Sequence, residues 1–200
     1  MIAGFIRLVC GAQARWQGCE PVARQRIYFA NHVSNLDGPV IWASLPNALR
    51  RCTRPVAARD YWLAGPVRRW LASRVFCAVL IERKRITAEN NPMRDFEAAI
   101  DAGSSLIIFP EGRRKEDEDA EMNPFKPGLW HLAKRRSDLE LIPVHLAQLD
   151  RMLPRGEFIF IPLMATITFG SPLPLPGEGE DKATFLARAQ RAVAELGKEH

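Results

Sequence analysis

Short apolar runs alternate along this chain with stretches whose apolar residues lie three or four positions apart. The first pattern is typical of buried strands and the second of amphipathic helices. The sequence predicts strands at residues 26–30, 53–57, 75–81, 105–109, 139–146 and 158–169, the last broken at Pro162. It predicts helices at residues 2–9, 38–45, 60–73, 92–102, 129–136 and 182–196, the third with a break at Gly65-Pro66.

Alternating strands and helices predict a single α/β domain with a mixed, largely parallel central sheet flanked by helices. The clearest helix is capped by Asn91, carries Pro92 in its first turn and ends at Gly103. The seven apolar residues from Val75 to Ile81 predict a strand that is buried on both faces. Polar residues that directly follow strands of this kind are expected to form the functional site.

The charge of the chain is unevenly distributed. The protein has 200 residues and a formal net charge of +5, but residues 1–110 hold fifteen Lys or Arg against eight Asp or Glu. This half therefore favours an anionic partner, such as a lipid head group, an acidic carrier protein or a nucleic acid. We exclude nucleic acid because no recognised reader motif is present and aromatic residues do not alternate with charges along a strand.

The cysteines, the histidines and the N-terminus narrow the class of protein further. Four cysteines without a C-x-x-C pair indicate reduced thiols in a cytosolic compartment, and four histidines without ligand spacing predict no metal. The apolar residues 1–12 are fewer than the roughly 20 that span a bilayer, and Arg7 interrupts them. They also lack the basic-then-apolar order of a signal peptide. We therefore expect a protein that lies on a membrane rather than across it.

The first candidate motif is Asn31-His32-Val-Ser-Asn-Leu-Asp37, between a predicted strand and a predicted helix. A neutral imidazole can accept a proton near pH 7, and a carboxylate on its other nitrogen would fix the tautomer. In a regular helix the two side chains would point about 140° apart. The pair can therefore act together only if His32 lies in the loop and Asp37 in the first helical turn. The alternative is an ordinary helix cap beside a hydrogen-bonded loop histidine.

Three further polar blocks follow strands or interrupt them. Arg83, in Ile81-Glu-Arg, could bind a phosphate with two hydrogen bonds, or it could be an ordinary surface residue. The run Phe109-Pro-Glu-Gly-Arg-Arg-Lys115 could form a tight turn that offers backbone N–H groups to an anion. Pro143, inside a predicted strand, would by itself indicate an edge strand or a bulge.

Taken together and in this order, the four blocks resemble those of the glycerolipid acyltransferase family, lysophosphatidate acyltransferase type, over residues 26–170. That family carries N-H-x-x-x-x-D, a strand ending in I-D-R, F-P-E-G-T-R-S and a later V-P-V. The resemblance implies that His32 and Asp37 are catalytic. It also implies that the acceptor is bound by residues of the second and third blocks and by the lysine that follows them, namely Arg83, Glu111, Gly112, Arg113, Arg114 and Lys126.

The resemblance further implies an acyltransferase domain at residues 26–200, preceded by an amphipathic, membrane-facing segment at residues 1–25. It implies transfer of an acyl group from acyl-CoA or acyl carrier protein to a lysophospholipid, with 1-acyl-sn-glycerol 3-phosphate as the first choice and phosphatidate as the product. No cofactor is expected. The protein would work as a peripheral protein on an anionic membrane, at its cytoplasmic face.

Several residues depart from the family pattern. Glu82 replaces Asp, Cys77 stands where Gly is usual, Arg113 replaces Thr and Lys115 replaces Ser. The added charges favour an anionic acceptor but leave the head group open, so another lysolipid such as a lyso-aminolipid is an alternative. A thioesterase and a non-catalytic module that binds lysolipid or carrier protein also remain as alternatives. The stretch 61–71, rich in aromatic residues and arginine, could face a membrane or pack into the core.

Overall fold

A central sheet organises the residues that the computed structural model describes, which are 2–83, 90–112, 122–148 and 164–198. Its strands are β1 (Gln13–Trp16), β2 (Arg26–Ala30), β3 (Thr53–Ala58), β4 (Val79–Ile81), β5 (Ser105–Ile108), β6 (Glu140–Ala147) and β7 (Thr166–Phe169). Within the described ranges their order is β1-β7-β6-β2-β5-β3-β4. All neighbouring strands are parallel except β6 and β7, so the sheet is mixed and largely parallel.

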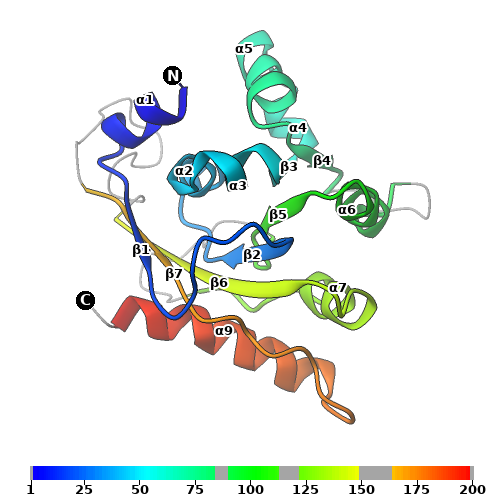
Figure 1. Cartoon of the computed structure of the whole chain (residues 1–200). Helices are drawn as coiled ribbons and strands as arrows, with labels where there is room; N and C mark the ends of the chain where they lie inside the picture. Colours follow the sequence, from blue (N-terminus) through cyan, green and yellow to red (C-terminus); the bar gives the residue numbers. More distant parts are fainter. Residues whose placement is uncertain (1, 84–89, 113–121, 149–163, 199–200) are drawn as a thin grey trace.

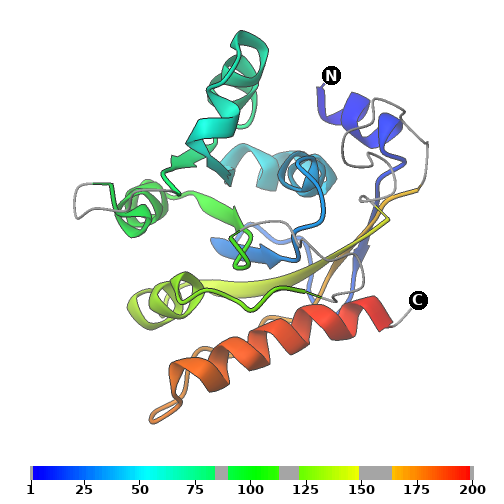
Figure 2. The same ribbon diagram turned by 180° about the vertical axis from the view of Figure 1, so that it is seen from behind.

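Both faces of this sheet are covered by helices (Figures 1 and 2). Ile27 and Phe29 of β2 point into one apolar layer, whereas Tyr28 and Ala30 point into the other, because side chains alternate along a strand. The first layer is closed by α6 (Pro92–Asp101), α7 (Gly128–Arg135) and α9 (Lys182–Lys198). The second is closed by α1 (Ile2–Val9), α2 (Asp37–Ser44) and α3 (Asn47–Cys52). Burial on both faces explains why the strands are nearly continuous apolar runs.

Two short helices lie beyond the sheet, α4 (Arg59–Trp62) and α5 (Pro66–Trp70), and a π-helical turn at Leu71–Val75 follows them. The chain breaks at Gly65-Pro66, as predicted, because Pro66 provides no N–H to continue α4 and instead starts α5. The predicted helix near residue 91 is also confirmed. The side chain of Asn91 accepts a hydrogen bond from the N–H of Met93, and Gly103 has a positive φ of 80° just after the helix.

The predicted strand at residues 75–81 is wrong in its first half. Only Val79–Ile81 forms a strand, because the preceding helix continues through the π-helical turn, where the N–H of Phe76 bonds to the carbonyl of Leu71. Phe76 is buried against the rings of Trp42 and Trp62. An apolar run alone could not distinguish a helix end packed in this way from a strand.

The structure contains a strand that the sequence did not predict, β1, and it places Pro143 in an interior strand rather than at an edge. Residues of β1 are mostly exposed and polar, so no apolar pattern marked them, but they pair with β7, and Trp16 stacks on Phe169 at 4.1 Å. Pro143 lies in β6, which is an interior strand between β2 and β7 rather than an edge. The N–H of Gly170 still bonds to its carbonyl, so Pro143 lies where the pairing with β7 ends. Of the predicted strand at 158–169, residues 158–163 lie outside the described part.

Candidate active site

His32 and Asp37 meet at the carboxyl end of β2. His32 lies in the loop after the strand and Asp37 is the first residue of α2, with His32 Nδ1 2.7 Å from Asp37 Oδ2. The same carboxylate oxygen accepts the backbone N–H groups of Val33 and Ser34, at 2.7 and 2.8 Å. The loop thus folds back on the carboxylate, which satisfies the geometric condition derived from the sequence.

Asp37 is fully buried, and its environment acts on its charge in two directions. Burial raises the pKa of its carboxyl above the ordinary value, whereas the hydrogen bonds from His32, Ser34 and Val33 oppose that rise. Three N–H groups aimed at one oxygen favour the ionised form locally. With Nδ1 bonded to Asp37, the other ring nitrogen of His32 is left for the adjoining cavity. The pair can therefore take a proton at Nε2 and hold the resulting imidazolium next to a carboxylate.

Glu111 links the third sequence block to the first. It is buried; one carboxylate oxygen accepts the backbone N–H of His32 at 2.7 Å and the other that of Asn123 at 2.8 Å. The ring of Phe109 stacks on the imidazole with centroids 4.6 Å apart. The sequence analysis assigned Glu111 to the acceptor. Both of its oxygens accept backbone N–H groups, so Glu111 holds the His32 loop in place, while its role toward the acceptor stays a prediction.

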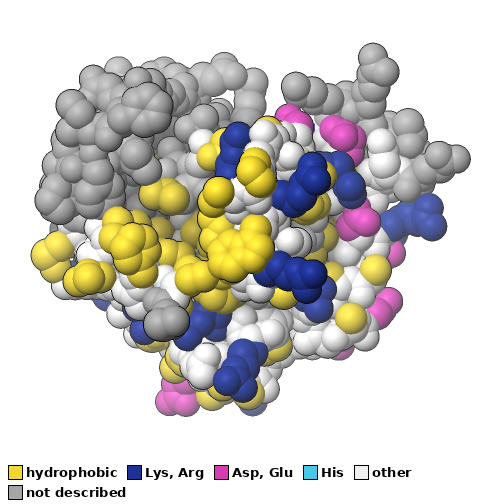
Figure 3. Space-filling model, turned by 90° about the horizontal axis from the view of Figure 1, so that it is seen from above, with side chains coloured by type: hydrophobic (Ala, Val, Ile, Leu, Met, Phe, Trp, Pro, Cys, Tyr) yellow, Lys and Arg dark blue, Asp and Glu magenta, His cyan; other side chains and the backbone are white. Residues whose placement is uncertain are grey.

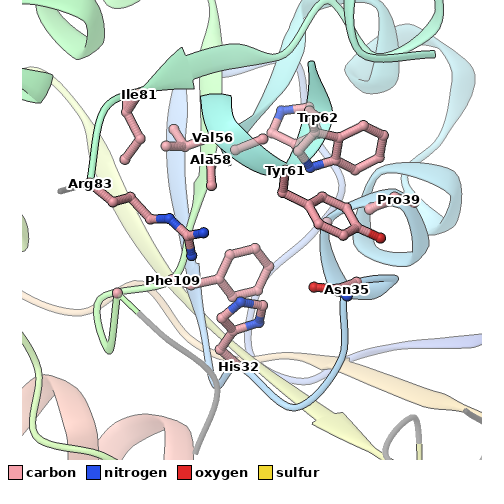
Figure 4. A pocket seen from close by; sticks show the side chains of 14 residues that line it. His32, Asn35, Pro39, Val56, Ala58, Tyr61, Trp62, Ile81, Arg83 and Phe109 are labelled. Carbon is pink, nitrogen blue, oxygen red and sulfur yellow. The ribbon is translucent and has the colours of Figure 1, made fainter. Parts of the chain in front are cut away.

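Arg83 extends from the end of β4 into the same cavity as His32. That cavity has a volume of about 240 Å³. Figure 4 shows the guanidinium of Arg83 directed toward Phe109 and His32, with Tyr61 and Trp62 on the opposite wall. The second block therefore lines the same cavity as His32 of the first block, as the sequence predicted. The strands β2, β3, β4 and β5 are parallel, so their carboxyl ends bring these residues to one edge of the sheet.

Gly112 and Lys126 lie together beyond Arg83. Gly112 has a positive φ of 70°, and a Cβ there would be 2.5 Å from Nζ of Lys126. The backbone N–H of Lys126 bonds to the carbonyl of Pro110, which fixes the lysine beside the turn. Arg113 and Arg114, also predicted to bind the acceptor, lie outside the described residues.

A second cavity of about 550 Å³ adjoins the first, because both are lined by Val56, Ile81, Arg83, Phe109 and Gly112. Its remaining walls are mainly apolar, and its cationic or polar lining includes Lys126, His131 and Arg135. Sequence reasoning did not predict the last two residues or Asn35 as part of the site, whereas it did consider the stretch that contains Tyr61 and Trp62 as a possible apolar groove beside it. The only available signal was that residues 58–62 directly follow a parallel strand. Cys77, in contrast, lines neither of these two cavities.

The described residues offer no group of three His, Cys, Asp or Glu side chains that could hold a metal ion. The chemistry visible at this edge of the sheet is instead that of a base, its carboxylate partner and cationic side chains. Such a set can activate a hydroxyl and bind an anion close to it.

Comparisons with known proteins place the chain in a family. The sequence model of a family described as Acyltransferase matches residues 14–147, which contain all four blocks. A 1-acyl-sn-glycerol-3-phosphate acyltransferase of Limnanthes douglasii is 27% identical over 180 residues, covering 86% of this chain and 59% of the relative. Taffazin of Dictyostelium discoideum is 28% identical over 147 residues, covering 67% and 49%. The chain thus spans 49% to 59% of the length of these relatives.

The fold also matches a solved structure. The crystal structure of the 1-acyl-sn-glycerophosphate (LPA) acyltransferase PlsC from Thermotoga maritima aligns with a TM-score of 0.72 at 19% identity. The alignment covers 99% of this chain and 79% of that chain. The agreement establishes a shared fold, which is the α/β arrangement expected from the sequence.

Proposed function

Because this chain belongs to the acyltransferase family, we propose that it transfers a fatty acyl group from a thioester to a hydroxyl of a phosphate-bearing lysolipid. The observation that carries this proposal is one cavity containing both His32, bound to the buried carboxylate of Asp37, and the guanidinium of Arg83. A base and an anion-binding group in one cavity suit an acceptor that has a hydroxyl near a phosphate. We propose 1-acyl-sn-glycerol 3-phosphate as the acceptor, with phosphatidate as the product.

The reaction proceeds by direct attack on the thioester. His32 Nε2 removes the proton of the acceptor hydroxyl as that oxygen bonds to the carbonyl carbon, and Asp37 stabilises the imidazolium. The tetrahedral intermediate then collapses, the carbon–sulfur bond breaks, and the thiolate leaves with the proton carried by His32. The thioester of coenzyme A or of acyl carrier protein provides the acyl group. No acyl-enzyme is formed, because the acceptor itself is the nucleophile.

The test is an assay of purified protein with a panel of lysolipids and both thioester types, read by mass spectrometry. His32→Ala is expected to lower kcat about 10²- to 10⁴-fold, because the hydroxyl loses its base. His200→Ala, which removes a histidine at the end of the chain, is the control and should retain wild-type rates. Full activity of His32→Ala would place the chemistry elsewhere, and a wild type without turnover on any acceptor would favour a binding module.

A variant of Arg83 distinguishes transfer of the acyl group from hydrolysis of the thioester. Water carries no phosphate, so Arg83→Ala should raise the acceptor KM strongly while it leaves any slow thioester hydrolysis unchanged. Equal loss of both reactions would mean that Arg83 does not act on the acceptor.

We further propose that the protein works as a peripheral protein on an anionic membrane surface, at its cytoplasmic face. This is supported by α1 and α5, which lie above the same side of the sheet in Figure 1, and by the large apolar side chains that they expose. Phe5 is 66% exposed, Leu8 82%, Val67 68% and Trp70 52%. Figure 3 shows hydrophobic side chains gathered on this face with lysine and arginine side chains beside them. Apolar residues flanked by cations suit the boundary of an anionic bilayer.

The two ends of the stretch 61–71 differ in their packing. Trp62 packs against Phe76 and lines the first cavity, whereas Trp70 and Val67 are exposed. No helix in the described part of the chain is both long and apolar enough to cross a bilayer.

A further inference from the structure

Arg83 is held by a carboxylate that no sequence block contains. Its Nη2 donates to both oxygens of Asp60, at 3.0 Å to Oδ1 and 3.3 Å to Oδ2. Asp60 is the second residue of α4, 23 positions before Arg83 in the chain. The contact therefore joins α4 to the end of β4, and it connects two segments that each contribute to the first cavity.

The contact with Asp60 occupies only one nitrogen of the guanidinium. In the ranges that the structure describes, Arg83 Nε and Nη1 make no hydrogen bond, although a guanidinium carries five N–H groups in a fixed plane. Arg83 lines both cavities, and its guanidinium faces His32 and Phe109 in Figure 4. Arg83 therefore has N–H groups available where the two cavities meet. An anionic group of the acceptor that binds there would lie beside the catalytic pair.

Asp60 itself lines neither cavity, so it acts on the site through Arg83. The side chains of Arg83 and Asp60 are 40% and 36% exposed. An arginine of this exposure with no fixed partner samples many rotamers and loses that freedom when an anion binds. A carboxylate that binds one nitrogen in advance removes part of this entropic cost and leaves the other N–H groups oriented for the ligand.

We propose that Asp60 is a positioning residue that holds Arg83 for the anionic group of the acceptor. The inference rests on the proposed function, in which Arg83 binds that group. It predicts that Asp60 affects acceptor binding and not the chemical step, because His32 and Asp37 make no contact with it. A competing effect of Asp60 is repulsion of the phosphate, and the two effects change the acceptor KM in opposite directions.

The experiment measures kcat and KM for lysophosphatidate in three variants of the full chain. Asp60→Asn is expected to raise the acceptor KM about tenfold, which corresponds to a modest loss of binding free energy, and to leave kcat within about twofold. Asp60→Glu, which retains the carboxylate, should recover much of the affinity. Asp101→Asn is the matched control, because it removes one of the two carboxylate partners of Arg136 in an exposed cluster outside both cavities.

A double-mutant cycle tests whether Asp60 acts through Arg83. In an Arg83→Ala background, Asp60→Asn should produce no further rise in KM. Additive losses, an unchanged KM for Asp60→Asn, or a lower KM for that variant would each overturn the proposal. The last outcome would show that Asp60 repels the acceptor instead.

Equilibrium binding of a short-chain, soluble lysophosphatidate separates this proposal from the proposed function. If the wild type shows no turnover, the proposed reaction fails, but the binding of this probe still reports on Asp60. Asp60→Asn and Arg83→Ala should then both weaken binding, with no added effect in the double variant. Binding that is insensitive to Asp60→Asn would refute the positioning role whether or not the protein is a transferase.

Discussion

At the scale of single residues, the imidazole of His32 is held by contacts from two separate parts of the chain. Asp37 bonds to its ring, while Glu111 bonds to its backbone and Phe109 stacks on its face. The ring therefore has little freedom to leave the orientation in which Nε2 reaches the cavity. Two of the residues that fix its position, Asp37 and Glu111, line neither cavity, whereas Phe109 lines both.

This arrangement predicts the behaviour of Glu111→Gln. The glutamine side chain keeps one oxygen that accepts a hydrogen bond. Its NH₂ group faces the backbone N–H of either His32 or Asn123, which then loses its acceptor. The His32 loop should shift, and kcat should fall about 10- to 100-fold while the acceptor KM changes little. Steady-state kinetics measure both constants, with the exposed Glu178→Gln as control. A selective rise in KM would return Glu111 to the acceptor site.

Cys77 provides a second residue-scale prediction. It has a positive φ of 46°, a conformation that costs a non-glycine residue about 1–2 kcal/mol, and it occupies a position where the family usually has glycine. Cys77→Gly should raise the free energy of unfolding by about 0.5–1 kcal/mol after the added flexibility of the unfolded chain is counted.

Urea denaturation measures the effect of Cys77→Gly. Cys52→Gly, at the end of α3, is the control and should destabilise the protein. A loss of stability in Cys77→Gly would show that contacts of the Cys77 side chain outweigh the backbone strain.

At the scale of elements, β2 and β6 are joined by an ion pair as well as by their backbone. The buried Arg26 of β2 donates to Glu140 of β6 at 2.8 Å, and Arg24 bonds to the other oxygen at 2.6 Å. Burial alone would raise the pKa of the Glu140 carboxyl, but the hydrogen bonds from Arg24 and Arg26 outweigh it and hold that pKa below its ordinary value.

Glu140→Gln should therefore cost about 2 kcal/mol of unfolding free energy at neutral pH, because Arg26 loses its charged partner. The folded pKa is depressed, so the stabilisation is present above the unfolded carboxyl pKa of about 4.3 and is lost as the pH falls through the folded value. Denaturation curves of wild type and variant should converge in acid. A gap that stays constant with pH would show that ionisation of Glu140 does not contribute.

The elements also show where sequence reasoning succeeds. The helix at 92–101 was predicted because its signals are local, namely a cap, a proline and a glycine. The His32–Asp37 pair was predicted from the resemblance of four ordered blocks, because its five-residue spacing alone left an ordinary helix cap open. The strand β1 was missed because its stability comes from pairing with β7, some 150 residues later. Asp60 was missed for a related reason, since its role depends on a contact with Arg83 that no spacing reveals.

At the scale of the whole molecule, the exposed apolar side chains of α1 and α5 lie on the side where the first cavity is bordered by α4. An acyl chain that leaves a bilayer could then reach the cavity without crossing water. The basic half of the chain contains both helices, so its charge favours an anionic surface on the same side.

The membrane proposal predicts a change in sedimentation with vesicles. Wild-type protein should sediment with anionic vesicles and much less with zwitterionic ones, and Leu8→Ser with Trp70→Ser should reduce the bound fraction several-fold, because each side chain contributes buried apolar area. Lys182→Ser, on the helix that covers the opposite face, is the control. Retained binding of the double variant would assign another face to the membrane.

The helix α2 lies between the His32–Asp37 pair and α1. Its first residue is Asp37, and the carbonyl oxygens of Ala43 and Leu45 at its last turn accept hydrogen bonds from Arg7 of α1. This helix of eight residues thus has the His32–Asp37 pair at its start and α1, the segment proposed to contact lipid, at its end. If α1 contacts lipid as proposed, Arg7 ties the helix that begins with Asp37 directly to the membrane-facing segment.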